Sequence, residues 1–190
     1  MSSLPFITAE GKATAEEQAV CIGCGLCCDG TLFAYAVLNP GERGNLPEKL
    51  EEQSYTEDGK DYFSLPCQYF EGKCMIYNLK RADVCSSYRC RLLKDLAAAK
   101  ITTDDAHGLV YGAKEMRDEI LEHYRDLSGE KERIHFKELL VKLGKPGKTP
   151  DEGSTYIAKY DLLIARCNIL EALLIKYFRP EEDFEKMIMR

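Results

Sequence analysis

The chain has 190 residues, of which 45% are hydrophobic and 31% charged, so it can bury a core and is not a disordered chain. Residues 1–100 carry 11 basic and 14 acidic side chains and residues 101–190 carry 15 and 18, which leaves −3 on each half and −6 in total. Because neither half is basic, we expect no nucleic-acid partner and no binding to anionic membranes.

The sequence carries no signal for membrane targeting. Residues Met1 to Phe6 lack both the basic and the apolar region of a signal peptide. The most apolar stretch, residues 156–178, is interrupted by five charged side chains and cannot span a bilayer. We therefore expect a cytoplasmic protein, and in that reducing compartment clustered thiols are metal ligands more often than disulfides.

Short elements are expected in the first half of the chain. The sequence predicts a short helix near residues 14–20, and the apolar run from Thr31 to Leu38 predicts a buried strand. A second short helix is predicted from Leu46 to Gln53. Asp58-Gly59 is typical of the turn of a β-hairpin.

From Ser87 onward the apolar residues recur at helical spacing. One helix is expected to run out of Cys90, a second to begin at Thr102 or Thr103, and a third to end at Gly144. After a loop at residues 147–154, a long helix is indicated by the stripe Tyr156, Tyr160, Leu163, Cys167, Leu170, Leu174 and Tyr177. The predicted fold is α+β: a small cysteine-rich metal-binding domain with short strands at residues 1–95, and a region of three or four helices at residues 96–190 packed on it.

Cysteine is the most informative residue, since eight of the nine cysteines precede residue 91. The first four form a cluster: Cys21, Cys24, Cys27 and Cys28. Two successive C-x-x-C steps are the spacing by which ferredoxin loops place three thiolates on one 4Fe-4S cluster. We expect a tight loop here, with Gly23 and Gly25 allowing the backbone angles and leaving N–H groups free to bond sulfur. Cys28 has no counterpart in that spacing, so the fourth ligand has to come from elsewhere.

A second group of cysteines supplies candidates for that ligand: Cys67, Cys74, Cys85 and Cys90. The eight thiols could form two four-sulfur sites, or one such site with spare structural thiols. Since adjacent side chains point in different directions, Cys27 can serve one centre while Cys28 faces another. The negative charge of such sites could be offset by nearby cations, which could also be ordinary surface residues: Lys80, Arg81, Arg89, Arg91 and Lys94.

The pattern resembles the bacterial and archaeal CxxCxxCC family, described as zinc- or iron-chelating, whose common members are the YkgJ-like cysteine cluster proteins. The match consists of the first cluster, Leu65-Pro66-Cys67, Cys74 to Tyr77, Arg81 to Cys85, and Cys90, and it covers roughly residues 20–95. Family members often have proline and arginine where this chain has Ala82 and Ser86. The resemblance implies metal chelation at all eight cysteines. One branch of the family is linked to lysine N-methylation of flagellin, but this sequence has no glycine-rich loop for a methyl donor.

Two other candidates lie outside the clusters. Cys167 falls in the apolar stripe of the last helix and is expected to be a core residue. His107 is the best histidine candidate for a position near the clusters, because Gly108 and Gly112 suggest close approach of another backbone.

Three interpretations of function follow. The favoured one is an iron–sulfur protein with at least one 4Fe-4S cluster, held by Cys21, Cys24, Cys27 and one cysteine of the second group, with a redox role or a role in a modifying enzyme. The second is a zinc-binding structural module that presents its helices to a protein partner. The third is a metalloenzyme with an open coordination position, such as a protein-modifying enzyme. Each implies a protein or redox partner that the sequence does not identify.

Overall fold

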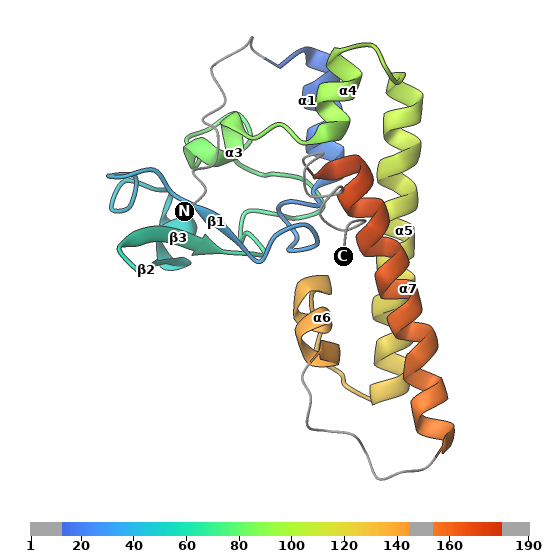
Figure 1. Cartoon of the computed structure of the whole chain (residues 1–190). Coiled ribbons are helices and arrows are strands. Elements are labelled where there is room, and N and C mark those ends of the chain that lie inside the picture. The colour runs from blue at the N-terminus through green and yellow to red at the C-terminus, as the bar shows by residue number, and fades with distance from the viewer. Residues whose placement is uncertain (1–12, 145–153, 180–190) are drawn as a thin grey trace.

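The computed structural model describes residues 13–144 and 154–179, and it has the predicted α+β fold. The helices are α1 (Ala15–Cys24), α2 (Glu48–Glu52), α3 (Asp83–Ser87), α4 (Arg91–Ala97), α5 (Thr103–Ser128), α6 (Phe136–Gly144) and α7 (Ser154–Phe178). The strands are β1 (Tyr35–Val37), β2 (Ser54–Glu57) and β3 (Lys60–Ser64). Figure 1 shows a helical lobe, made by α1 and α4–α7, and a sheet lobe, made by the strands with α2 and α3.

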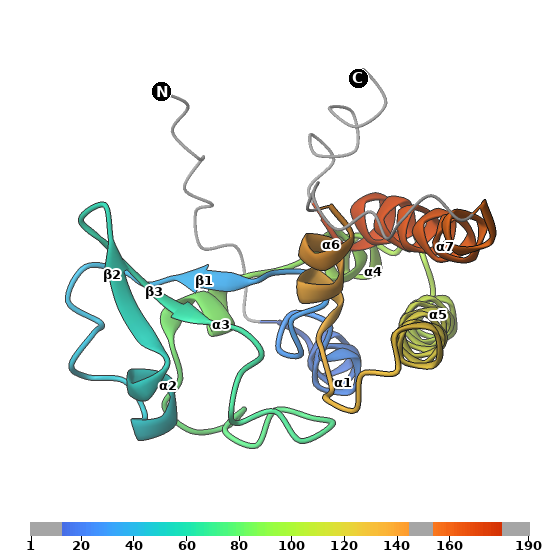
Figure 2. The same ribbon diagram turned by 90° about the horizontal axis from the view of Figure 1, so that it is seen from below.

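The helical lobe is built on two long helices, α5 and α7. They lie side by side and run in opposite directions, and α1 and α4 pack at one end of them (Figures 1 and 2). Their buried residues recur every three or four positions, which places them on one face of each helix. On α5 these are Ala106, Val110, Ala113, Ile120 and Tyr124, and on α7 they are Leu163, Cys167, Leu170, Leu174 and Phe178.

Capping boxes fix where α1 and α5 begin. At α1 the Thr14 hydroxyl accepts from the Glu17 N–H and the Glu17 carboxylate accepts from the Thr14 N–H. Thr102 and Asp105 make the same reciprocal pair of hydrogen bonds at α5. Of the two predicted starting residues, Thr102 is therefore the cap and Thr103 the first helical residue. The helix expected near residues 14–20 is longer than predicted, because α1 continues through Cys21 to Cys24.

The sheet lobe contains an antiparallel sheet with the strand order β1-β3-β2. The predicted hairpin is confirmed: Glu57 pairs with Lys60, and Asp58 and Gly59 turn the chain with positive φ. The buried strand predicted from Thr31 to Leu38 is wrong in length and burial, since β1 covers only Tyr35–Val37. Tyr35 and Val37 point to the same face of the sheet, because alternate residues of a strand share a face, and they are 52% and 47% exposed.

Two hydrophobic cores are found among the described residues. The core of the sheet lobe consists of Leu38, Leu50, Phe63, Ile76 and Ala82. The larger core joins α5, α6 and α7 to side chains from the cysteine-rich half, namely Val20, Leu26, Leu32, Leu92 and Leu93. The predicted domain boundary between residues 95 and 96 falls inside α4, and the division of the chain at that point stays a prediction.

The remaining predicted elements can be compared with the structure. α2 and α4 occupy the predicted positions, α6 ends at Gly144 as expected, and α3 was not predicted. The predicted loop at residues 147–154 lies outside the described residues, apart from Ser154, which begins α7. The close approach expected at Gly108 and Gly112 is wrong, because a Cβ added at either position meets nothing within 4 Å.

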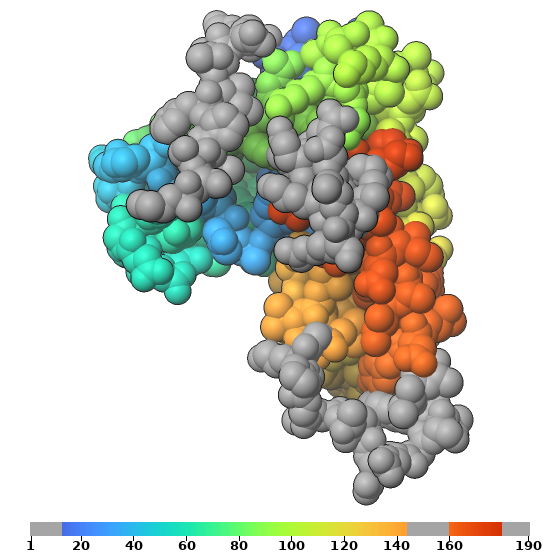
Figure 3. Space-filling view, viewed as in Figure 1, coloured from blue at the N-terminus to red at the C-terminus, as the bar shows by residue number. Residues whose placement is uncertain are grey.

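The sheet lobe stands out to one side of the helical lobe in the space-filling view (Figure 3). Among the described helices we find none that combines the length and the apolar character that a bilayer crossing requires.

Candidate metal centre

The first cysteine cluster begins on a helix rather than in a loop. Cys21 and Cys24 lie in the last turn of α1, and Gly25 ends the helix with φ +71°. A residue with a side chain is strained at that φ, and its Cβ would also collide with the Phe70 ring. The expectation of a tight loop from Cys21 onward is therefore wrong for its first half. Gly23 sits within the helix, where nothing crowds its α-carbon, so only Gly25 needs to be glycine.

A tight turn after Gly25 carries the next two cysteines. The Gly25 carbonyl accepts from the N–H groups of Cys28 and Asp29 at 2.8 and 3.0 Å. The Leu32 N–H then donates to the Leu26 carbonyl at 2.9 Å and closes the turn. Leu26 is completely buried in the large core, so the turn is anchored from within.

Four thiols gather at the end of α1, and we call them the helical thiol group: Cys21, Cys24, Cys27 and Cys90. Cys27 interacts electrostatically with each of the other three. Cys24 interacts with Cys21 and Cys90 in the same way, and Cys90 interacts with Cys21. All four line a cavity of about 50 Å³, and Cys28 lines it as well. The other walls are largely apolar and include Leu26, Leu92, Leu93 and, from the end of α7, Phe178.

The other four thiols of the two clusters lie in or beside the sheet lobe and form the sheet thiol group: Cys28, Cys67, Cys74 and Cys85. Cys28 interacts electrostatically with the other three. The Cys67 N–H donates to the Cys28 carbonyl at 2.7 Å, which ties the chain after β3 to the first cluster. Cys67 and Cys74 pack against the small core.

The two groups are direct neighbours. The peptide bond between Cys27 and Cys28 joins them, and Cys21 also interacts electrostatically with Cys28 and Cys74. The thiols of each group are neighbours, but within the part of the chain that the structure describes no three Cys, His, Asp or Glu side chains are arranged to hold a metal ion.

Burial sets the protonation of these thiols. Loss of hydration raises the pKa of Cys24 and Cys85 to about 12 and that of Cys90 to about 11, and it also raises the pKa of Cys21, Cys27, Cys28 and Cys67. Neighbouring thiols raise several of these pKa values further. At neutral pH the groups are therefore protonated, and a metal would have to displace their protons.

Backbone N–H groups lower the pKa of three of these thiols. The Leu26 N–H donates to the Cys24 sulfur, the Tyr69 N–H to the Cys67 sulfur, and the Leu92 and Leu93 N–H groups to the Cys90 sulfur, and each bond lowers the pKa of its thiol. Such donors stabilise a thiolate, and hydrogen bonds to sulfur also help to set the reduction potential of iron–sulfur clusters.

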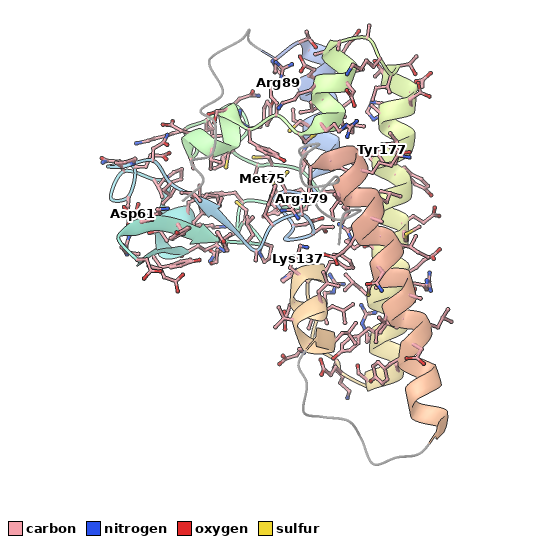
Figure 4. All side chains as sticks on the ribbon, viewed as in Figure 1. Asp61, Met75, Arg89, Lys137, Tyr177 and Arg179 are labelled. Carbon is pink, nitrogen blue, oxygen red and sulfur yellow. The ribbon has the colours of Figure 1, made fainter. Side chains whose placement is uncertain are left out.

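The nearby cations fall into two classes. Arg81 lowers the pKa of one thiol of each group, Cys21 and Cys85, and its guanidinium lies 4.1 Å from the centre of the Tyr77 ring. Arg89 instead forms an ion pair with Glu17, whose side chain is only 2% exposed (Figure 4). This pair joins α1 to the residue before Cys90. Arg91 pairs with Asp95 at 3.5 Å within α4.

A larger cavity of about 470 Å³ lies beside the turn that follows Cys28. Arg117 of α5 reaches across its wall, forming an ion pair with Asp29 and donating to the Thr31 hydroxyl at 3.4 Å. The negative charge of Asp29 also raises the pKa of Cys24. The ion pair therefore fixes the thiol-bearing turn to the long helix.

Several of these contacts could not be found in the sequence. Glu17 lies three residues after Thr14, and that spacing predicts a cap but gives no sign of Arg89. Asp29 and Arg117 are 88 positions apart, and no local pattern connects them. Of the two candidates outside the clusters, Cys167 is 1% exposed in the large core, as predicted, whereas His107 is exposed on α5.

No protein-family model matches the chain, and neither the curated proteins nor the solved structures gave a significant match.

Proposed function

We propose that this chain is an iron–sulfur protein that transfers electrons, with a 4Fe-4S cluster held by Cys21, Cys24, Cys27 and Cys90. The observation that carries the proposal is the cavity of about 50 Å³ that these four thiols line together with Cys28. A cubane fills the space between its ligands, because each sulfur binds a different iron. A single zinc ion instead needs four sulfurs about 2.3 Å from one point.

The chemistry of the donor set suits such a cluster in three ways, although the described thiols are not arranged around a metal ion in this structure. Thiolates are the usual ligands of iron–sulfur clusters. Backbone N–H groups already point at the sulfurs of Cys24 and Cys90. The largely apolar walls would shield the cluster from water. When bound, the cluster supplies a one-electron redox centre, and the chain's own residues orient the thiols and limit solvent access.

We assign the sheet thiol group to a second metal centre. Four thiols from separate segments of the chain gather there, and Arg81 lies within electrostatic reach of both groups. Eight thiols are thereby used in two sets of four. This agrees with the chelation that the CxxCxxCC resemblance implies.

A zinc-binding module that binds a protein through its helices is the second candidate. One observation favours it: Leu162 and Ile169 on α7 are 60% and 58% exposed, and Tyr111 on α5 is 67% exposed. Large apolar side chains on a helix surface are suited to contact with another protein.

Metal analysis of protein that is made and handled without oxygen decides between the two. Iron, inorganic sulfide and zinc are quantified on one sample together with the visible spectrum. We expect a brown protein with iron and sulfide. The Cys27→Ala variant should lose the helical cluster, whereas the variant of its neighbour, Cys28→Ala, should keep it. A colourless protein with stoichiometric zinc and no sulfide would contradict the proposal and support the zinc module.

A further inference from the structure

The loop from Gly72 to Ala82 exposes apolar side chains next to the thiols. Met75 is 48% exposed and Leu79 is 68% exposed, although the small core of the same lobe has few buried side chains. Met75 directly follows Cys74, and Figure 4 shows it on the side of the sheet lobe that faces α1 and α7. Exposed apolar side chains of this size are suited to form the centre of a contact with another protein.

The same loop is basic on an acidic protein. Lys73, Lys80 and Arg81 lie between Gly72 and Ala82, and Glu71 and Asp83 border the loop, so residues 71–83 carry a net charge of +1 whereas the whole chain carries −6. Lys73 and Lys80 are exposed. A basic patch around apolar side chains is complementary to a protein surface that carries carboxylates around an apolar centre.

This loop is also linked to both thiol groups. Cys74 belongs to the loop, and Cys85 follows it at three residues from Ala82. Cys21 and Cys85 are the two exposed thiols among the eight, and both interact electrostatically with Arg81. Arg81 is held in place by its contact with the Tyr77 ring. The most accessible thiol of each group therefore lies within electrostatic reach of one residue of this loop.

We propose that the loop from Gly72 to Ala82 is the docking surface for an acidic electron-carrier protein, and that electrons enter through it. This inference rests on the proposed iron–sulfur function. The electron balance is simple: a flavin hydroquinone anion on the carrier loses one electron and becomes the neutral semiquinone, and one ferric site in the protein becomes ferrous. No bond is formed or broken, so contact and orientation are all that the surface has to provide.

The first test measures binding alone. A purified acidic flavodoxin in its oxidised form is titrated into the anaerobically prepared protein in a calorimeter at low salt. Lys80→Glu and Leu79→Ser should each weaken binding, the former by about tenfold. The matched control is Lys60→Glu, which makes the same charge change on the exposed end of the β-hairpin and should leave the Kd within about twofold. Equal weakening by Lys60→Glu would show that only net charge matters and would overturn the docking site.

The second test measures electron transfer in a stopped-flow instrument. Photochemically reduced flavodoxin should reduce Lys80→Glu about tenfold more slowly than the wild type, and high salt should remove the difference. Dithionite, which needs no protein surface, should reduce both at the same rate. If dithionite reduces both proteins normally and flavodoxin reduces Lys80→Glu as fast as the wild type, the docking site is wrong while the iron–sulfur function stands. If dithionite reduces no centre in the wild type, the iron–sulfur function fails and the docking proposal fails with it.

Discussion

The helical and sheet thiol groups contain four cysteines each, but they lie in different surroundings. The helical group lies between α1, α4 and the end of α7. The apolar residues around it belong to the large core, which also contains the buried side chains of α5 and α7. The sheet group lies in a lobe whose described residues include only five buried apolar side chains. If both groups bind metal as proposed, the comparison predicts that they depend on it to different degrees: packing can preform the helical group, whereas the metal has to complete the sheet group.

Removal of metal should separate the two regions most strongly. We expect anaerobic chelation to unfold the sheet lobe, because a lobe with so small a core is not stable alone. The helical lobe should keep the packing of α5 against α7. Amide hydrogen exchange measures both: protection should vanish in β2 and β3 and persist in α5. Equal loss of protection in the two lobes would show that they fold as one unit.

The ion pair between Glu17 and Arg89 should affect the helical group more than the sheet group. We expect Glu17→Gln to lower the free energy of unfolding by about 2 kcal/mol, less than for a fully buried pair because the Arg89 side chain is 27% exposed. Thermal unfolding checks this value. Glu16→Gln is the control, since it removes a charge from an exposed position on the same turn.

Metal analysis of the same variant sharpens the comparison. Glu17→Gln should release metal from the helical group at lower chelator concentrations than the wild type, while the sheet group should keep its affinity. A variant that weakens both groups equally would show that the ion pair supports the whole protein and not one group.

Cys167 tests whether a thiol can belong to the helical lobe without belonging to a metal site. Cys167→Ser should leave the metal content unchanged and destabilise the protein by about 1–2 kcal/mol, because a hydroxyl would be buried without a partner. Metal per chain and denaturant unfolding are measured on the same preparation. Loss of metal from a folded Cys167→Ser variant would contradict the assignment of this residue to the core.

The smallest effect is expected at the start of α5. Hydrogen bonds from Thr102 hold the pKa of Asp105 below its usual value of 3.8. A lowered pKa means that the carboxylate stabilises the folded state above about pH 4, and that this contribution disappears as the pH falls through the folded-state pKa. The melting temperature of Asp105→Asn should therefore lie below that of the wild type at neutral pH and approach it in acid. Asp104→Asn, which removes a neighbouring charge outside the capping box, should show no such convergence.

Local patterns in the sequence predicted the local elements well. The Asp58-Gly59 hairpin, the cap at Thr102 and the stripe that buries Cys167 are each decided within a few residues, so propensity and periodicity are enough. The strand differs from the prediction for residues 31–38, because side-chain burial depends on which face of the sheet the rest of the chain covers. An apolar run alone does not reveal that face.

The partition of the thiols was less predictable. The sequence identified the eight cysteines of the two clusters and predicted that Cys27 and Cys28 face different neighbours, as their electrostatic partners show, but it left the fourth member of the helical group open. Cys90 takes that place because the Glu17–Arg89 ion pair and the packing of α4 bring its segment to α1. Contacts between segments so far apart follow from tertiary packing, which no spacing rule contains.

The position of Phe178 has a consequence for the order in which the protein is made. On the ribosome, every cysteine of the sheet thiol group has been synthesised once Cys85 has emerged, so that group can take up metal while the chain is still growing. The cavity of the helical thiol group receives one of its walls from Phe178, at the end of the last helix. A cluster delivered there is enclosed only after α7 has been translated and has docked. On the proposed function, the sheet group could therefore bind its metal before the cavity of the helical group is closed.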